Sequence, residues 1–178
     1  KNISNRKLNQ LCIKKIVLTY IFKAMKISEI LTKKNIIKDL KSFDKESVLE
    51  ELSNFLKDRG EIPDKKNLLL SLIEREKLGS TGIGENVAIP HAKIRDIDKI
   101  ITVFARSQIG VEFESLDQKP VNFIYLILAP ENSTGQHLKA LARISRLFKN
   151  PSLRESVLRA NETDQIYSIL VDEDSKFT

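Results

Sequence analysis

The feature that most constrains the fold of this chain is an almost wholly apolar segment, Val-Asn-Phe-Ile-Tyr-Leu-Ile-Leu-Ala, over residues 121–129. Its β-branched and aromatic residues favour a strand, and the near absence of polar alternation is typical of a strand that is buried on both faces. Pro130 follows at once and ends the pattern. We therefore expect residues 121–129 to form the central strand of a sheet.

Amphipathic segments with helix-start signals precede this strand. Asp44 and Asp64 are good N-caps, and the apolar residues that follow each of them recur at helical spacing. Gly60 and Gly79 stand where each helix should end. The sequence therefore predicts two helices between residues 44 and 79, the second of which carries Arg75 in its last turn.

Helical patterns also follow the apolar strand, so strands and helices share one domain. Ser133 and Gln136 predict a capping box that opens a helix reaching Asn150. Shorter helices are expected over residues 26–31, 152–160 and 163–171. Strands are expected over residues 87–89 and 99–106, with a shorter one beginning at Val111 and Phe113, and residues 35–42 should form a strand or an edge segment. Helices before, between and after strands indicate a single α/β layered domain.

A glycine-rich turn leads into a histidine over residues 79–92, Gly-Ser-Thr-Gly-Ile-Gly-Glu-Asn-Val-Ala-Ile-Pro-His-Ala. The glycines allow successive N–H groups of the turn to point at one anion, and Ser80 and Thr81 can add hydroxyls or simply cap the loop. Pro90 has no N–H, so we expect the short strand to end there and to present His91 at its carboxyl end. This stretch is the candidate site.

A lone histidine is more often a structural residue than a reactive one, but this setting favours reactivity. An imidazole with an ordinary pKa near 6.5 is mostly neutral at pH 7, so it can act as a nucleophile, a base or a metal ligand. The chain has only two histidines, His91 and His137, and its single cysteine, Cys12, is far away. Because no zinc-ligand spacing is present, we expect neither a metal nor another cofactor.

The segments Arg-Glu-Lys-Leu-Gly-Ser-Thr-Gly-Ile-Gly at residues 75–84 and Val-Ala-Ile-Pro-His-Ala at residues 87–92 carry a clear resemblance. They resemble the enzyme IIA domains of the fructose and mannitol type in the phosphoenolpyruvate-dependent sugar phosphotransferase system, and above all the stand-alone nitrogen-regulatory variant. The resemblance covers roughly residues 25–175. It implies a mixed central sheet with helices on both faces.

The resemblance also implies roles for individual residues. His91 matches the histidine that takes a phosphoryl group from HPr or a related carrier, with Nε2 as the favoured atom. Arg75 and His137 match residues that stabilise the phosphoryl group and the histidine, and Ser80, Thr81, Gly82 and Gly84 would neighbour the phosphate. Two departures, Glu85-Asn86 in place of Asn-Gly and Ala92 in place of Gly, make the backbone of the loop less free. Glu74 and Glu76 are interpreted as solvated charges.

The basic surplus of the chain is confined to one end. The formal net charge is +6, but six of the 30 basic residues lie within residues 1–24, which contain no acidic residue. The remainder has 24 basic and 24 acidic residues and few aromatic residues. A neutral domain without a basic stripe is a poor candidate for nucleic-acid binding.

Residues 1–24 are expected to be an extension, because Met25 is the only methionine and the resemblance begins there. We interpret them as an upstream segment, disordered or weakly helical, ahead of a domain over residues 25–175 and a tail over residues 176–178. A secretory signal is the alternative, but its apolar run is short and lacks a clean cleavage pattern. We expect no membrane insertion and a cytoplasmic location.

These features predict a phosphoryl carrier that acts as a free-standing, nitrogen-type regulator, with an HPr-type donor and a target protein as partners. One alternative is a subunit that passes phosphate from His91 to an enzyme IIB during fructose or mannitol uptake. A second is a protein-binding regulator that is not phosphorylated. A sugar permease encoded beside this protein would favour the transport role.

Overall fold

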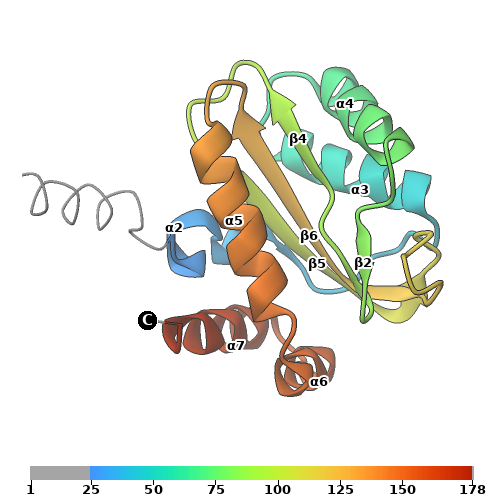
Figure 1. Ribbon diagram of the computed structural model, residues 1–178, viewed down its shortest axis with the longest axis vertical. Helices are drawn as coiled ribbons and strands as arrows, with labels where there is room; N and C mark the ends of the chain where they lie inside the picture. The colour runs from blue at the N-terminus through green and yellow to red at the C-terminus, as the bar shows by residue number, and fades with distance from the viewer. Residues whose placement is uncertain (1–24, 178) are drawn as a thin grey trace, which may run out of the picture.

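A six-stranded mixed sheet forms the middle of the molecule in the computed structural model, which describes residues 25–177 (Figure 1). β6 is its central strand, antiparallel to β5 on one side and parallel to β3 and β4 on the other. This confirms the prediction for residues 121–129. The strands are β1 (Ile36–Ile37), β2 (Gly82–Gly84), β3 (Val87–Ala88), β4 (His91–Ile94), β5 (Ile101–Val111) and β6 (Val121–Pro130).

Helices cover both faces of this sheet, and a separate apolar core fills each interface. One core lies between the sheet and α2, α5, α6 and α7, and the other lies between the sheet and α3 and α4. The expected α/β fold with helices on both faces is therefore confirmed. The helices are α2 (Ile27–Ile30), α3 (Lys45–Asp58), α4 (Lys65–Lys77), α5 (Thr134–Leu147), α6 (Pro151–Arg159) and α7 (Thr163–Ser175), with a short 3₁₀ turn, η1 (Lys33–Asn35).

The two predicted aspartate caps are present, whereas the predicted capping box is not. Asp44 accepts a hydrogen bond from the Ser47 N–H, and Asp64 accepts two from the first turn of α4. Ser133 precedes α5 as expected, but its hydroxyl donates to the Pro130 carbonyl at 2.8 Å and makes no cap bond. The capping box was wrong because the turn after β6 takes up the serine hydroxyl.

Two strand predictions also need correction. The strand expected at residues 99–106 and the start of the shorter strand expected from Val111 belong to one strand, β5 (Ile101–Val111), whose pairing with β6 continues past an irregularity between Arg106 and Val111. Gly110 has a φ of +91° there, and this bulge breaks the alternation that the sequence shows. At the sheet edge, only Ile36 and Ile37 of the expected segment 35–42 are paired.

Pairing with β6 is interrupted at Pro90 and resumes after it. β3 and β4 pair with β6 in one unbroken register, from Val87 opposite Phe123 to Ile94 opposite Pro130. Between them the Ile89 N–H turns away and donates to the Thr81 carbonyl at 3.0 Å. β3 ends at Ala88, before Pro90, as expected. His91 does not lie beyond the last paired residue, however, because pairing resumes and His91 begins β4.

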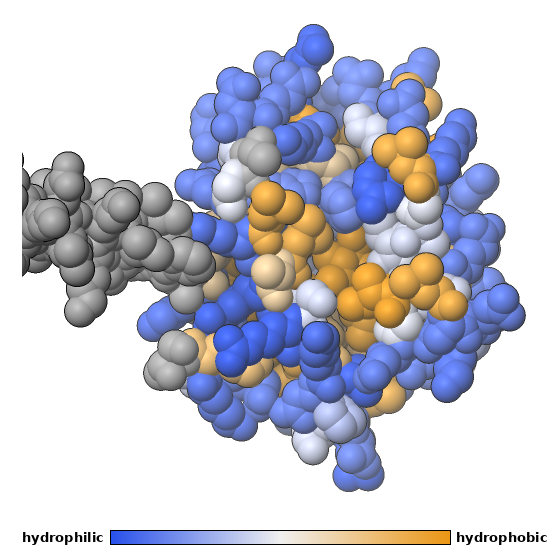
Figure 2. All heavy atoms as spheres, in the orientation of Figure 1, coloured by the Kyte–Doolittle hydropathy of each residue, from blue (hydrophilic) through white to orange (hydrophobic). Residues whose placement is uncertain are grey.

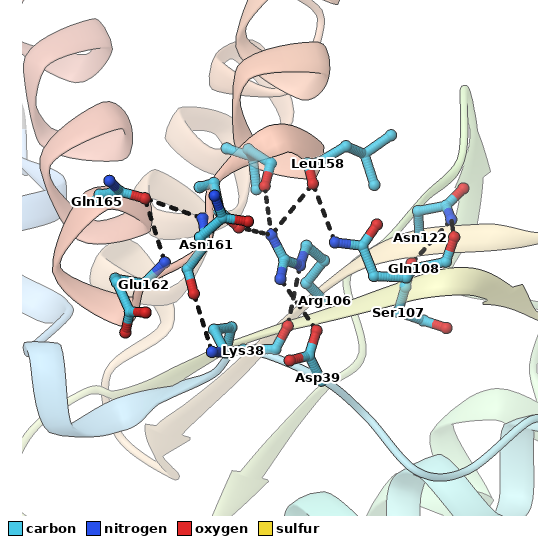
Figure 3. Close-up of polar contacts among 12 residues, drawn as sticks. Lys38, Asp39, Arg106, Ser107, Gln108, Asn122, Leu158, Asn161, Glu162 and Gln165 are labelled. Atoms are coloured by element: carbon cyan, nitrogen blue, oxygen red, sulfur yellow. Dashed lines mark hydrogen bonds and ion pairs between the residues drawn. The ribbon is translucent and has the colours of Figure 1, made fainter.

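A buried arginine ties α6 to the sheet (Figure 3). Arg106 of β5 is 2% exposed, and its guanidinium donates to the carbonyls of Val157 and Ala160 at 2.8 and 2.6 Å. It also donates to the Lys38 carbonyl and the Asp39 carboxylate. The carbonyls at the end of α6 thus accept hydrogen bonds from Arg106 of β5, and these bonds fix the helix against the sheet.

A second buried arginine joins the two ends of the described chain. Arg143 of α5 pairs with Asp174 of α7, and the same carboxylate accepts the Ile27 N–H at 2.8 Å. α2 and α7 accordingly lie side by side (Figure 1). The predicted extension, residues 1–24 with Cys12, lies outside the described residues.

Candidate functional site

His91 lies where the free edge of β4 faces two helices. Within residues 25–177, β4 pairs only with β6, and α4 packs against it on one side of the sheet. Side chains alternate along β3 and β4, so that His91 follows Val87 and Ile89 on the face that α5 covers. In Figure 1, β4 is seen between α4 and α5. Arg75 reaches His91 from α4, and His137 reaches it from α5.

Hydrogen bonds define the role of each ring nitrogen of His91. Nδ1 lies 2.8 Å from the Ile89 carbonyl oxygen, which can only accept, so Nδ1 carries the proton. Nε2 receives a hydrogen bond from Nε of Arg75 at 3.0 Å, and a guanidinium can only donate. The imidazole is therefore neutral, and its lone pair is on Nε2. A second bond, from Arg75 to the Gly79 carbonyl at 2.9 Å, fixes the guanidinium.

Burial lowers the pKa of His91 below its ordinary value of 6.5. The hydrogen bond to the Ile89 carbonyl raises this pKa, the charge of Arg75 lowers it, and the charge of Glu76 raises it. Because burial is the largest of these effects, the partly buried ring stays neutral at pH 7. A neutral ring is what a nitrogen nucleophile requires.

His137 lies in the first turn of α5 and meets His91 edge to face, with ring centroids 5.2 Å apart. It is only 7% exposed, and burial lowers its pKa, with further lowering by the positive charges of Lys93 and Arg75. Its Nδ1 atom is buried without a hydrogen-bond partner among the described residues. A neutral imidazole with one uncommitted nitrogen thus lies beside His91.

The glycine-rich loop is bonded within the protein. The Thr81 N–H donates to Glu76, the Gly82 N–H to the Ser80 hydroxyl, and the Gly84 N–H to the Ser115 hydroxyl. The Ser80 hydroxyl itself donates to the Phe113 carbonyl at 3.1 Å. These contacts favour a supporting role for the loop, and direct contact of Ser80, Thr81, Gly82 or Gly84 with a phosphate stays a prediction.

Of the two acidic residues that flank Arg75, only Glu74 is exposed as expected. The Glu76 side chain is 6% exposed and accepts hydrogen bonds from both the N–H and the hydroxyl of Thr81. Lys45 lies 3.6 Å from it. The interpretation of Glu76 as a solvated charge was therefore wrong, because its partners come from α3 and from the loop, which the sequence pattern of α4 does not show.

Exposed apolar side chains lie close in sequence to the site residues. Leu78 is 85% exposed, Leu138 61% and Ile83 42%, next to Arg75, His137 and the loop respectively. Figure 2 shows hydrophobic residues gathered over α5 and over the strands beside it. An apolar rim of this kind is typical of a surface that docks another protein.

Neither a metal centre nor a membrane span is found in residues 25–177. No three side chains of the metal-binding types come close enough there to hold an ion. None of the helices in the same range has the length and apolar character needed to cross a membrane. The functional groups at the site are thus two neutral imidazoles, one guanidinium and one buried carboxylate, from His91, His137, Arg75 and Glu76.

A neutral histidine at the edge of a mixed α/β sheet lies beside an arginine and a second histidine, an arrangement that suits the binding of an anionic group. Residues 29–173 match the family described as "Phosphoenolpyruvate-dependent sugar phosphotransferase system, EIIA 2". The chain belongs to this family, as its resemblance implied, and is thus a phosphotransferase component.

Relatives of both expected kinds are found within the family. The chain is 37% identical over 147 residues to the nitrogen regulatory protein of Bradyrhizobium diazoefficiens, covering 82% of this chain and 95% of that protein. It is 38% identical over 146 residues to the fructose-specific EIIABC component of Bacillus subtilis, covering 82% of this chain but only 23% of that protein.

Solved structures agree with these sequence relatives. The nitrogen regulatory protein IIA-Ntr of Neisseria meningitidis has a TM-score of 0.75 and 35% identity, covering 81% of this chain and 98% of that one. The Escherichia coli mannitol enzyme IIA, solved in complex with phosphorylated enzyme IIB, has a TM-score of 0.68 at 22% identity, covering 80% and 97%. The second likeness concerns the fold alone.

Proposed function

We propose that this chain is a phosphohistidine carrier, in which Nε2 of His91 accepts a phosphoryl group from an HPr-type protein. The observation that carries this proposal is the pair of bonds on His91. Because Ile89 holds the proton on Nδ1, the lone pair lies on Nε2, at the side of the ring that Arg75 reaches. A nucleophile in this state needs no base to activate it.

In the transfer step, the Nε2 lone pair attacks phosphorus, and the bond between phosphorus and the donor's histidine nitrogen breaks. The bonding electrons return to the donor nitrogen, and the Nδ1 proton of His91 stays in place. The phosphorylated ring gains positive charge, which the Ile89 carbonyl stabilises through its hydrogen bond at 2.8 Å. No water and no metal are needed as reactants.

Arg75 must release Nε2 before phosphorus can approach it. Its Nε–H group occupies the Nε2 lone pair in this structure, so the guanidinium has to shift by a small rotation. Once the phosphoryl group is in place, the planar fork suits its peripheral oxygens, where the charge of the loose transition state collects. His137 can donate to the same oxygens, since a neutral ring has one N–H group.

The regulatory role is the favoured biological setting. The nitrogen regulatory protein of Bradyrhizobium diazoefficiens is matched over 95% of its length, whereas the fructose-specific EIIABC component of Bacillus subtilis is matched over 23% of its length. In a regulator, phosphorylation at His91 would change how the apolar rim binds a target protein. We place this activity in the cytoplasm, where phosphoenolpyruvate is formed.

Phosphorylation is tested by incubating the protein with enzyme I, HPr and phosphoenolpyruvate and measuring its intact mass. We expect one acid-labile phosphoryl group on the wild-type protein and none on His91→Ala. Equal labelling of His91→Ala and wild type would refute the assignment.

The second candidate function, phosphoryl transfer to an enzyme IIB, is supported by the fructose-specific relative. The pre-labelled protein is mixed with a fructose-type enzyme IIB, and loss of label from His91 is followed. Fast transfer would favour the transport role. Retention of label would favour regulation if the phosphorylated and unphosphorylated proteins also differ in their binding to a target protein. If the protein is never labelled, the alternative of a protein-binding regulator without phosphorylation would be supported.

A further inference from the structure

A buried carboxylate lies directly behind the site. Glu76 is adjacent to Arg75 in the last turn of α4, and its side chain is 6% exposed. Oε2 accepts the Thr81 N–H at 3.1 Å, and Oε1 accepts the Thr81 hydroxyl. An ionised group at such a depth is retained only when it is fully partnered, and here its partners are a loop residue and Lys45.

Lys45 connects this carboxylate to the molecular surface. Its ammonium group lies 3.6 Å from Glu76 and 2.6 Å from Glu114, and its side chain is 13% exposed. The three charges line one wall of a cleft of about 820 Å³ between α3, α4 and the loop that joins β5 to β6.

From Thr81 the path to the histidine runs through the backbone of Ile89. The Thr81 carbonyl accepts the Ile89 N–H at 3.0 Å, and the Ile89 carbonyl accepts Nδ1–H of His91 at 2.8 Å. Pro90 has no N–H, so the peptide unit that carries the Ile89 carbonyl donates no hydrogen bond, and the bond from the Ile89 N–H to Thr81 is a contact that holds Ile89 in place. Displacing Thr81 therefore displaces the acceptor that defines the His91 tautomer.

We propose that Glu76 is a positioning residue: through Thr81 and the Ile89 carbonyl, it holds His91 in the tautomer that leaves Nε2 free to react. The neighbours Arg75 and Glu76 would then control opposite nitrogens of one ring. This inference rests on the proposed function for its consequence, a faster phosphoryl transfer. Its structural part can be tested without any donor.

The test uses nitrogen-15 NMR of the unphosphorylated full chain, which reports the protonation of Nδ1 and Nε2 separately. The variant is Glu76→Gln, which has the same shape but can accept only one of the two Thr81 bonds. The matched control is Glu74→Gln, which removes the same charge from an exposed position of the same helix. Thr81→Val, which loses the hydroxyl bond alone, provides a second variant if Glu76→Gln fails to fold.

We expect Glu76→Gln to populate the Nε2–H tautomer and to lower the pKa of His91, since the negative charge that raises it is lost. The charged groups close to the ring from its neighbouring elements are Arg75 and Glu76 of α4, and the titratable ring of His137 faces it from α5. Phosphorylation by HPr should slow about tenfold, because a misaligned nucleophile loses much of the benefit of orientation. Glu74→Gln should match wild type in every readout.

The outcomes separate the two proposals. A wild-type tautomer and pKa in Glu76→Gln or Thr81→Val would overturn the positioning role, whether or not the labelling rate falls. A shifted tautomer in a protein that HPr never labels would support positioning while refuting the phosphocarrier function.

Discussion

The imidazole of His91 is the reacting group in the proposed function. Its tautomer and its protonation depend on single residues around it. The Ile89 carbonyl fixes the proton on Nδ1, and Arg75 contacts Nε2. His137 contributes a second neutral ring, 5.2 Å away between centroids. The Arg75 and His137 contacts are made by side chains and can be removed separately, so both roles can be measured.

We expect His137→Ala and Arg75→Ala to retain phosphorylation but to react more slowly. Losing one preorganised donor in an enclosed site costs ~10²-fold or more, and the cost should be smaller here because His91 is only partly buried. Arg75→Lys should recover part of the rate, since an ammonium group is a point charge without the bidentate fork. Rapid-quench labelling measures all three variants.

Two results would contradict these roles. Wild-type rates in both alanine variants would make His137 and Arg75 purely structural. Loss of all label in His137→Ala, with His91 intact, would move the nucleophile to His137.

The sequence predicted the three central side chains but not their support. His91, Arg75 and His137 were found through a motif and a family resemblance, and the structure brings them together. Glu76 was missed because a buried glutamate and a solvated one look the same on a helical pattern. Its partners Lys45 and Thr81 become visible only when α3, α4 and the loop are packed.

At the scale of elements, α6 depends on one arginine from β5 (Figure 3). Arg106→Met should lower the free energy of unfolding by about 3 kcal/mol, because the carbonyls at the end of α6 lose their buried donor. Urea unfolding monitored by circular dichroism measures the loss.

Arg95→Met is the matched control for this prediction. Arg95 also pairs with a carboxylate, that of Glu131, but its side chain is 78% exposed. Exposed ion pairs are worth between 0 and about 1 kcal/mol, so this variant should be nearly as stable as wild type. Equal losses in Arg106→Met and Arg95→Met would show that the buried contacts of Arg106 are not what holds α6.

Local patterns in the sequence predicted most helices and strands. The aspartate caps were predicted correctly because their partners lie within three residues, and the apolar strand because its own composition indicates burial on both faces. The Ser133 cap failed because β6 ends in a carbonyl that takes the hydroxyl. The break at Pro90 was overestimated, since pairing with β6 continues on both sides of it.

Across the whole molecule, the two histidines link folding stability to pH. Burial lowers the pKa of His91 and of His137 below their ordinary value of 6.5. The unfolded chain therefore binds protons at a higher pH than the folded protein does. The free energy of unfolding should fall as the pH drops from about 6.5 towards the lowered folded-state pKa values.

Urea titrations between pH 7.5 and pH 5.5 measure this dependence. The double variant His91→Gln/His137→Gln removes both titrating groups and should flatten the decline over this range. The idea would be rejected if wild type became more stable with acid, or if the decline persisted unchanged in the double variant.

The architecture of the whole molecule could be predicted only in part from the sequence. Periodicity predicted an α/β domain, but the mixed sheet with helices on both faces followed from the resemblance, because pairing direction leaves no local signal. The closure of the two ends through Arg143, Asp174 and Ile27 joins residues far apart in the chain. No pattern within either segment indicates it.

The most direct measurement is nitrogen-15 NMR of the protein after phosphorylation by enzyme I, HPr and phosphoenolpyruvate, with phosphorus coupling used to identify the bonded nitrogen. We predict coupling at Nε2 of His91 and a proton retained on Nδ1. Phosphorus bonded to Nδ1 of His91, or to either nitrogen of His137, would contradict the mechanism proposed for this site.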